Sequence, residues 1–263
     1  MISPLANIHP NAKIGTGVTI EAFASVYGDV VIGDNTWVGP NVTIFDGARI
    51  GSGVRIFPGA VISAIPQDLK FAGEQTTAEI GDNTVIREMV TVNRGTSALG
   101  KTVIGSNCLL MAYVHIAHDC MLGNQVILAN SVNLAGHVTI DDWAILEGYV
   151  GVSQFVRIGA HAFIAGQTGV RKNVPPFTRA AREPLSFVGI NSVGMKRRGF
   201  DQESINVVQD LYRLLYNKGY STRNALDIIE KEIPSHKLKD EIIEFIQASD
   251  NGIMRGYSGG DND

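Results

Sequence analysis

The sequence predicts a mainly β protein: a parallel β-helix of hexapeptide repeats followed by a small C-terminal α-helical domain. The first observation is a six-residue period that runs, with two interruptions, from Ile2 to Val170. The second is the composition, with 29 glycines and only 7% aromatic residues, which favours a repeat rich in tight turns. The third is the change to helical periodicity after Pro175 and Pro176.

Each repeat places one large and one small residue on the inner side of a short strand. Along the uninterrupted runs every sixth residue is aliphatic, and the residue two before it is small or β-branched. Side chains two apart on a strand share a face, so each hexad forms a strand with these two residues inward and then turns. Neither a helical period nor a long alternating strand fits this pattern. Stacked coils of three hexads, about 18 residues each, would bury a continuous core.

Two interruptions of the period are expected to be loops that leave the β-helix. In the first, two positions that should be aliphatic hold Asp68 and Glu74, so a loop is expected near residues 64–79. A shorter loop is expected near residues 93–103. Loops that leave a regular repeat often carry binding sites, although an insertion without a function is the alternative.

The periodicities divide the chain into three parts. The β-helix is expected over residues 1–176, a connector over 177–200 and a helical domain over 201–263. Asp201 and Ser221 are expected to cap the first two of three amphipathic helices. Such a domain would cover the end of the β-helix, where an uncovered strand edge could pair with other chains.

Charge and hydropathy argue against several classes of function. The net charge of −4 gives no basic footprint for nucleic acid. No apolar run approaches the roughly 18 residues of a membrane span, and the opening MISPLANIHP lacks the features of a secretory signal. Two cysteines without a disulfide framework fit a reducing compartment. We therefore expect a cytoplasmic protein without a membrane span or a nucleic-acid partner.

The segment HIAHDC, residues 115–120, concentrates reactive side chains. The repeat places Cys108 and Cys120 in small inner positions, so both are predicted to be core residues without a metal or redox role. Four histidines miss both inner positions and are expected to project outward, where a solvated surface residue is the simplest interpretation: His115, His118, His137 and His161.

Stacking by one coil groups some of these outward residues. His118, Gly136 and Gln154 fall at equivalent positions on three successive coils, and Asp119 lies next to His137. A histidine that acts as a general base needs an acceptor on its other ring nitrogen, which Asp119 or a carbonyl could supply. A metal site would need converging histidines and a carboxylate, whereas His118 and its neighbouring histidine diverge across a turn. The general base is the favoured interpretation, and no metal is predicted.

Five motifs resemble the UDP-N-acetylglucosamine O-acyltransferases, the family that opens lipid A biosynthesis, and the resemblance covers nearly the whole chain. It implies a left-handed β-helix and a homotrimer with active sites in clefts between neighbouring subunits. It also implies transfer of an (R)-3-hydroxyacyl chain, carried on the phosphopantetheine of acyl carrier protein, to the 3-hydroxyl of UDP-N-acetylglucosamine, without a cofactor of the enzyme's own. The motifs are PQDLKFAGE (66–74), IREMVTVNRGT (86–96), LLMAYVHIAHDCMLGN (109–124), ILANSVNLAGHV (127–138) and INSVGMKRRGF (190–200).

The resemblance also implies roles for individual residues. His118 matches the general base, Asp119 its orienting neighbour and Gly136 the glycine whose N–H stabilises the oxyanion. A backbone donor of this kind is commonly worth about 10²–10³ in rate, and proton transfer about 10²–10⁴. The residues matching contacts to the nucleotide-sugar are Asp68 and Lys70 for the sugar, His115, His137 and Gln154 for further contacts, and Asn191, Arg197 and Arg198 for the nucleotide and its phosphates.

Three further positions bear on specificity. Gly166 matches the position that sets acyl-chain length, and the missing side chain predicts a long chain. Ser153 and Val193 stand where some members carry histidine and glutamate, which affects how the nucleotide-sugar is recognised. The basic KRR run at 196–198 suits an acidic carrier protein, although a solvated basic face is the simpler alternative.

Other functions are compatible with a hexapeptide β-helix. One is a different acyltransferase, either a small acetyl-CoA enzyme or the later N-acyltransferase of the same pathway. The latter would carry an additional N-terminal nucleotide-binding domain, whereas the hexads here begin at Ile2. The others are a binding or scaffold protein without catalysis and a carbonic-anhydrase-like metal site between subunits.

Overall fold

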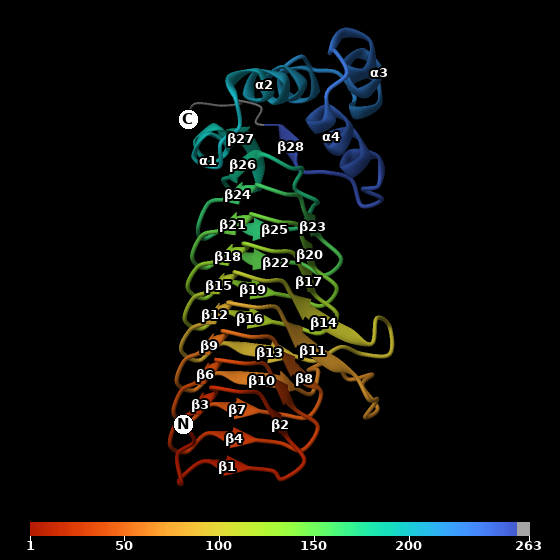
Figure 1. Ribbon diagram of the computed structural model, residues 1–263. Helices are drawn as coiled ribbons and strands as arrows, with labels where there is room; N and C mark the ends of the chain where they lie inside the picture. Colours follow the sequence, from red (N-terminus) through yellow and green to blue (C-terminus); the bar gives the residue numbers. More distant parts are fainter. Residues whose placement is uncertain (257–263) are drawn as a thin grey trace.

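The predicted β-helix is confirmed in the structure, a computed structural model that describes residues 1–256 (Figure 1). Short parallel strands form the three sides of a left-handed helix of stacked coils. Each strand pairs with its equivalent on the next coil, as Ile116 does with Leu134. The six-residue period therefore sets both the turns and the register between coils.

The three sides differ in their number of strands. The nine-stranded sheet contains β1 (Asn7–Ile8), β4 (Ser25–Val26), β7 (Thr43–Ile44), β10 (Val61–Ala64), β13 (Thr91–Asn93), β16 (His115–Ile116), β19 (Asn133–Leu134), β22 (Gly151–Val152) and β25 (Gly169–Val170). The eight-stranded sheet contains β2 (Lys13–Ile14), β5 (Val31–Ile32), β8 (Ala48–Ile50), β11 (Thr77–Ile80), β14 (Lys101–Ile104), β17 (Met121–Leu122), β20 (Thr139–Ile140) and β23 (Arg157–Ile158). The eleven-stranded sheet contains β3 (Thr19–Ile20), β6 (Trp37–Val38), β9 (Arg55–Ile56), β12 (Val85–Ile86), β15 (Leu109–Leu110), β18 (Ile127–Leu128), β21 (Ile145–Leu146), β24 (Phe163–Ile164), β26 (Thr178–Ala181), β27 (Ser186–Ile190) and β28 (Arg255–Gly256).

The core is a column of aliphatic side chains along the axis. Leu110, Ile116 and Leu128 are fully buried, as the period predicts. Burying each such side chain contributes about 1.5–3 kcal/mol. Cys108 and Cys120 lie in the same core, and burial raises the pKa of the Cys120 thiol to about 12.

Three corners join the sheets. The first corner lies between the nine- and eight-stranded sheets, the second between the eight- and eleven-stranded sheets, and the third between the eleven- and nine-stranded sheets. Most turns contain a residue in the left-handed region, for example Asp119 (φ 58°), His161 (φ 59°) and Tyr149 (φ 62°) at the first, second and third corners. Their side chains leave the core, so equivalent residues on successive coils lie one above the other.

Both predicted loops leave the β-helix at the first corner. The first excursion, residues 65–76, connects β10 to β11, and the second excursion, residues 94–100, connects β13 to β14. Both project from the side of the coils in Figure 1. The two excursions therefore lie on the corner that carries His118.

The expected connector is more structured than the sequence indicates. Within 177–200, β26 and β27 form an antiparallel hairpin that extends the eleven-stranded sheet, and α1 (Ser192–Arg197) follows. The hexad pattern ends before this hairpin, which explains why the strands were missed. The sheet continues without the six-residue repeat because antiparallel pairing replaces stacking of coils.

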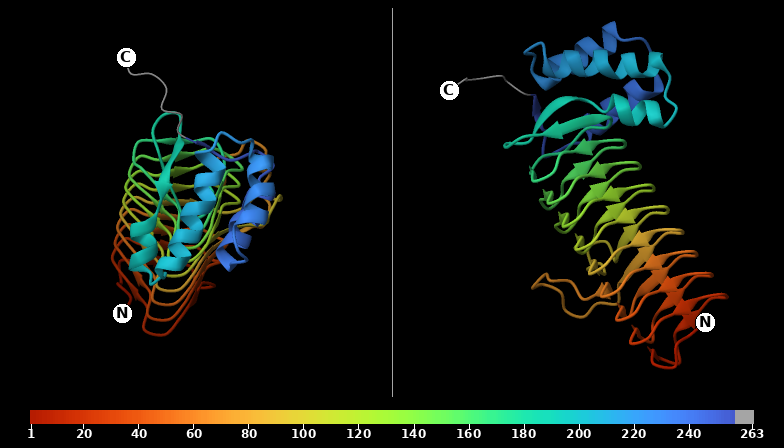
Figure 2. Two further views of the ribbon diagram at one scale, coloured as in Figure 1. Left: turned by 90° about the horizontal axis from the view of Figure 1, so that it is seen from above. Right: turned by 90° about the vertical axis from the view of Figure 1, so that its left-hand side faces the viewer.

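Three helices lie over the end of the coils, as Figure 2 shows. They are α2 (Gln202–Tyr216), α3 (Thr222–Glu232) and α4 (Lys237–Gln247). The predicted caps are confirmed, because Asp201 accepts from the N–H of Ser204 and Ser221 from that of Asn224. The end of the helical domain expected over 201–263 lies outside the described residues. Among residues 1–256, no helix combines the length and apolarity that crossing a bilayer requires.

Candidate active site

His118 and Asp119 form a buried pair at the first corner. His118 is 5% exposed and Asp119 0%, so the alternative interpretation of His118 as a solvated surface residue does not hold. Both side chains leave the core as predicted, but the second excursion bonds to Asp119, and Gly136 and His137 lie against His118. Nδ1 of His118 lies 2.8 Å from Oδ2 of Asp119. Because an ionised carboxylate only accepts, Nδ1 carries the proton and Nε2 keeps the free lone pair that a general base needs.

The Asp119 carboxylate has a full set of donors. Oδ1 accepts from the N–H groups of Thr96 and Leu99, and Oδ2 accepts from the Thr96 hydroxyl as well as from His118. Burial raises the pKa of Asp119, but the hydrogen bonds from Thr96 and His118 lower it, and the net shift is downward. Asp119 is therefore a stable anion that orients His118.

Gly136 lies directly over the His118 ring. A Cβ at this position would lie 2.6 Å from Cε1 and 2.7 Å from Nε2 of His118, so only glycine leaves space for the ring. Within residues 1–256 the N–H of Gly136 has no acceptor. A free backbone donor beside Nε2 is what an oxyanion-stabilising group requires.

His137 completes the cluster. Its Nε2 lies 3.7 Å from Oδ2 of Asp119, as the stacking of coils predicts. The ring meets His118 edge-on and stacks on Phe155, with centroids 4.7 Å apart. Phe155 is 56% exposed and extends this surface by one coil. Stacking by 18 residues predicts this contact, since Phe155 occupies the coil position above His137.

The three groups also have the composition of a metal site. Ligand atoms of His118, Asp119 and His137 lie within 4.8 Å of one another, a convergence that was not foreseen for His137. Both oxygens of Asp119 are already occupied by donors from the protein. A cation would have to displace these bonds, so the arrangement favours an oriented base.

Other expected substrate contacts lie on the strand before the first corner, on the corner itself and on the first excursion. His115, on β16, lies 2.7 Å from the Thr91 hydroxyl through Nδ1, and burial lowers its pKa. Gln154 is exposed. On the first excursion, Asp68 accepts from the N–H of Lys70, whose side chain is exposed.

A second group of expected substrate contacts lies on other sides of the β-helix. Asn191 caps α1 through Oδ1 and donates through Nδ2 to the carbonyl of His161, so both ends of its amide have partners within the chain. The structure therefore gives Asn191 a role in positioning α1, and a direct contact to the nucleotide stays a prediction. Gly166 lies at the third corner, where a Cβ would come within 3.0 Å of the Gly148 carbonyl.

Arg197, the last residue of α1, and Arg198, its C-cap, point to different sides of the molecule. Arg197 lines a cavity of about 280 Å³ on the eleven-stranded side, together with Arg179 and Phe163. Arg198 turns to the second corner, where Nη1 donates to Nδ1 of His161 at 3.2 Å and the guanidinium lies over Trp143. Burial, and then the charge of Arg198, lowers the pKa of His161 to about 4. His161 leaves the core as predicted but is only partly exposed, so the simplest interpretation of a freely solvated residue does not hold.

Comparison with known proteins assigns the family. Residues 173–254 match the family model described as "Udp N-acetylglucosamine O-acyltransferase; Domain 2", and residues 29–64 and 101–136 match hexapeptide transferase repeats. An acyl-[acyl-carrier-protein]–UDP-N-acetylglucosamine O-acyltransferase of Thermodesulfovibrio yellowstonii is 44% identical over 97% of this chain and 92% of its own. That of Xanthomonas oryzae is 43% identical over 97% and 98%. The chain belongs to the UDP-N-acetylglucosamine O-acyltransferase family.

Solved structures of UDP-N-acetylglucosamine acyltransferases support the same family assignment. The protein from Bacteroides fragilis superposes with a TM-score of 0.96 at 50% identity, covering 97% of this chain and all (100%) of that one. The protein from Francisella novicida gives 0.94 at 42% identity, covering 97% and 94%. The family and the acyltransferase activity predicted from the motifs are thereby confirmed.

Within this O-acyltransferase, the sequence located the catalytic group better than its surroundings. Stacking predicted the proximity of His118 to Gly136 and of Asp119 to His137. It did not predict Thr96, because its contact with Asp119 depends on how the second excursion folds back. The run IREMVTVNRGT carried the only sequence signal for that residue, through the resemblance.

Proposed function

We propose that this chain transfers an (R)-3-hydroxyacyl group from acyl carrier protein to the 3-hydroxyl of UDP-N-acetylglucosamine, with His118 as the general base. The observation that carries the proposal is the free Nε2 of His118 beside the free N–H of Gly136. The names of the relatives support the choice of donor and acceptor. A cytoplasmic location and the use of no cofactor beyond the carrier's phosphopantetheine are part of the proposal.

The chemistry follows from these two groups. Nε2 of His118 takes the proton of the sugar 3-hydroxyl as that oxygen attacks the thioester carbonyl. The developing oxyanion accepts from the N–H of Gly136. Collapse of the intermediate breaks the carbon–sulfur bond, and the proton passes from His118 to the phosphopantetheine sulfur. Asp119 keeps the ring in the required tautomer and stabilises the imidazolium that forms between the two steps.

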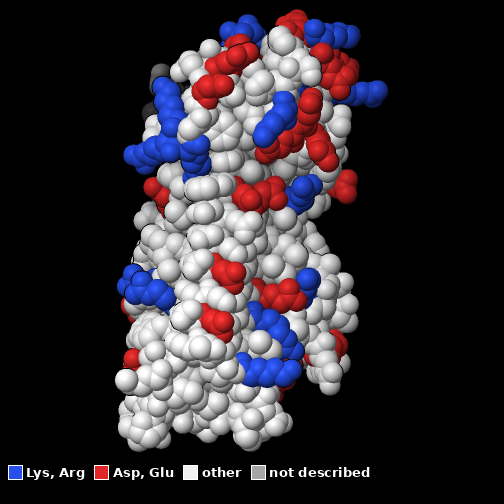
Figure 3. All heavy atoms as spheres, viewed as in Figure 1, with Lys and Arg blue, Asp and Glu red and all other residues white. Residues whose placement is uncertain are grey.

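The cavity beside α1 is the proposed site of the nucleotide. Arg179 and Arg197 line it, and within the described chain neither forms an ion pair. Phe163 and Val193 supply apolar walls. Basic side chains gather on this side of the molecule in Figure 3. Guanidinium groups suit a diphosphate, and the apolar wall suits a base, so we assign the cavity to the nucleotide.

We propose a homotrimer because one chain cannot assemble all of these groups. His118 lies at the first corner, Gly166 at the third, and the cavity with Arg197 on the eleven-stranded side. A second copy that packs its third corner against the first corner of its neighbour would bring the sets together. The third corner carries a ridge of large apolar side chains that are at least half exposed: Phe23, Met89, Tyr113 and Tyr149.

The donor and acceptor are tested directly with purified protein. A series of acyl carrier protein thioesters of different chain length is offered with UDP-N-acetylglucosamine, and the product is identified by mass spectrometry. We expect a single O-acylated sugar nucleotide and a preference for long 3-hydroxyacyl chains. A product acylated on nitrogen, or equal use of acetyl-CoA, would contradict the proposal. Offering the corresponding 3-amino sugar nucleotide in competition measures the choice of acceptor.

The shared site is tested by subunit complementation. His118→Ala and Arg197→Glu chains are co-expressed with different tags, and mixed oligomers are isolated. If one site takes His118 from one copy and Arg197 from another, mixed oligomers regain activity that neither variant has alone. The control pairs His118→Ala with Gly136→Ala, which lie in the same corner and should regain none. Mixed oligomers no more active than the separate variants would exclude the shared site.

A further inference from the structure

The second excursion, residues 94–100, encloses the Asp119 carboxylate. Thr96 donates to it twice, from its N–H to Oδ1 at 3.0 Å and from its hydroxyl to Oδ2 at 2.6 Å. The N–H of Leu99 donates to Oδ1 at 3.2 Å. Thr96 is 8% exposed. Three of the four donors to Asp119 therefore come from this one loop.

The Thr96 hydroxyl can point only one way. Its oxygen accepts from the N–H of Ala98 at 3.2 Å, which commits its own hydrogen to Asp119. Oδ2 thus lies between the Thr96 hydroxyl and Nδ1 of His118. A carboxylate that accepts on both oxygens from fixed donors cannot rotate, so the direction of its bond to His118 is set by the loop.

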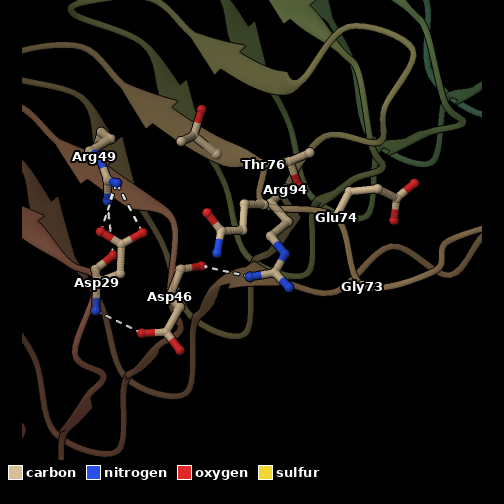
Figure 4. A pocket seen from close by; sticks show the side chains of 9 residues that line it. Asp29, Asp46, Arg49, Gly73, Glu74, Thr76 and Arg94 are labelled. Carbon is tan, nitrogen blue, oxygen red and sulfur yellow. Dashed lines mark hydrogen bonds and ion pairs between the residues drawn. The ribbon is translucent and has the colours of Figure 1, made fainter.

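The first residues of the second excursion are themselves fixed by hydrogen bonds. The N–H of Gly95 donates to the carbonyl of Thr77, and the Thr76 hydroxyl donates to the carbonyl of Gly95 at 2.6 Å. Figure 4 shows Arg94 reaching the backbone of Asp46, where Nη1 donates to the carbonyl at 3.2 Å. The two excursions and the coil below them therefore form one support for Thr96.

We propose that Thr96 is a positioning residue for the general base, acting through the Asp119 carboxylate. The inference rests on the proposed role of His118. Thr96 does not touch the reacting atoms; it fixes the orientation of the carboxylate and shares its charge. Without the hydroxyl, Oδ2 is held by His118 alone and attracts the imidazolium proton more strongly.

This predicts a change in the pH dependence of the reaction. The other titratable groups around Asp119 are His137, at 3.7 Å, and Cys120, whose thiol stays neutral because burial raises its pKa to about 12. A substitution of Thr96 leaves both of these side chains in place. Stronger retention of the His118 proton therefore moves the acidic limb of the kcat/KM profile to higher pH.

The test compares Thr96→Val and Thr96→Ser with wild type. Valine keeps the shape and the backbone donor but removes the hydroxyl, so kcat should fall about tenfold to a hundredfold, the range for a lost hydrogen bond to a charged group. The KM for the sugar nucleotide should change less than about twofold, since only positioning of the base is affected. Serine should restore kcat to within about threefold of wild type and should restore the acidic limb.

A matched control separates positioning from folding. Thr84 is fully buried, and its hydroxyl donates to the carbonyl of Gly105 at 2.8 Å away from the site. Thr84→Val should lower thermal stability without moving the pH profile. A Thr96→Val enzyme with wild-type kcat and an unmoved acidic limb would overturn the inference. Wild-type activity in His118→Ala would instead overturn the proposed function.

Discussion

The first and second corners of the β-helix have the same kind of turn and similar carboxylates, but the carboxylates have different roles. At the second corner, Asp34, Asp82 and Asp142 each accept from the backbone of the coil below, at 2.7 Å and in contact with solvent. At the first corner, Asp119 has no exposed surface and accepts from a loop and from His118. The three second-corner aspartates join coils, whereas Asp119 orients a base.

The difference lies in what covers the turn. The second corner has no excursion, so its aspartates meet water and backbone amides. At the first corner, residues 94–100 supply fixed donors to Asp119, which has no exposed surface. A regular repeat therefore provides stacked positions, and an interruption of the repeat turns one of them into a site.

The largest expected effect is in His118→Ala. Removal of the base should lower kcat by about 10²–10⁴, and loss of the buried ring and its bond to Asp119 should also lower the unfolding temperature. The second-corner counterpart, Asp82→Ala, removes a bond to the N–H of Ser52 and should reduce stability by about 1 kcal/mol with unchanged kcat. Initial rates and thermal unfolding measure both. Equal loss of activity in the two variants would erase the contrast between the corners.

Gly136→Ala should lower kcat by about 10²–10³. The new methyl group would lie 2.6 Å from Cε1 of His118, so the ring and the backbone donor must move apart. Gly51 offers a second-corner control, since a Cβ there would lie 2.4 Å from Oδ1 of Asp82. Gly51→Ala should destabilise the fold but spare kcat in the protein that remains folded. Rates per folded molecule distinguish the two.

Gly166→Met tests the third corner. A side chain here should shorten the groove for the acyl group, so the preferred donor becomes shorter by several carbons while overall folding is kept. Competition between acyl carrier protein thioesters of different length reports the preference. An unchanged product distribution would refute the assignment of Gly166 to chain length.

The smallest effect concerns stability at the second corner. The pKa of His161 is about 4 in the folded protein, against about 6.5 in an unfolded chain. The unfolded chain binds the proton first as the pH falls, so stability is lost from about pH 6.5 down to about pH 4. His161→Gln binds no proton, and its unfolding temperature should fall less between neutral pH and about pH 5. Parallel losses in the two proteins would show that His161 does not contribute.

Much of the fold follows from residues that alternate in and out of the core. The aliphatic position at Ile116 and the small position at Cys120 determine that His118 and Asp119 leave the core. The period then places Gly136 one coil away. These inferences hold because stacking in a repeat is local and each coil from His115 onward has the same length.

The sequence by itself determined the β-helix, the family and the axial grouping of His118, Asp119 and Gly136. Only the tertiary structure decided that the pair is buried, that Thr96 holds Asp119 and that Asn191 is committed to capping α1. It also separated Arg197 from Arg198 and from His118. The physical reason is that a period specifies neighbours along the axis, whereas loops and caps depend on competition among hydrogen-bond partners that are distant in the chain.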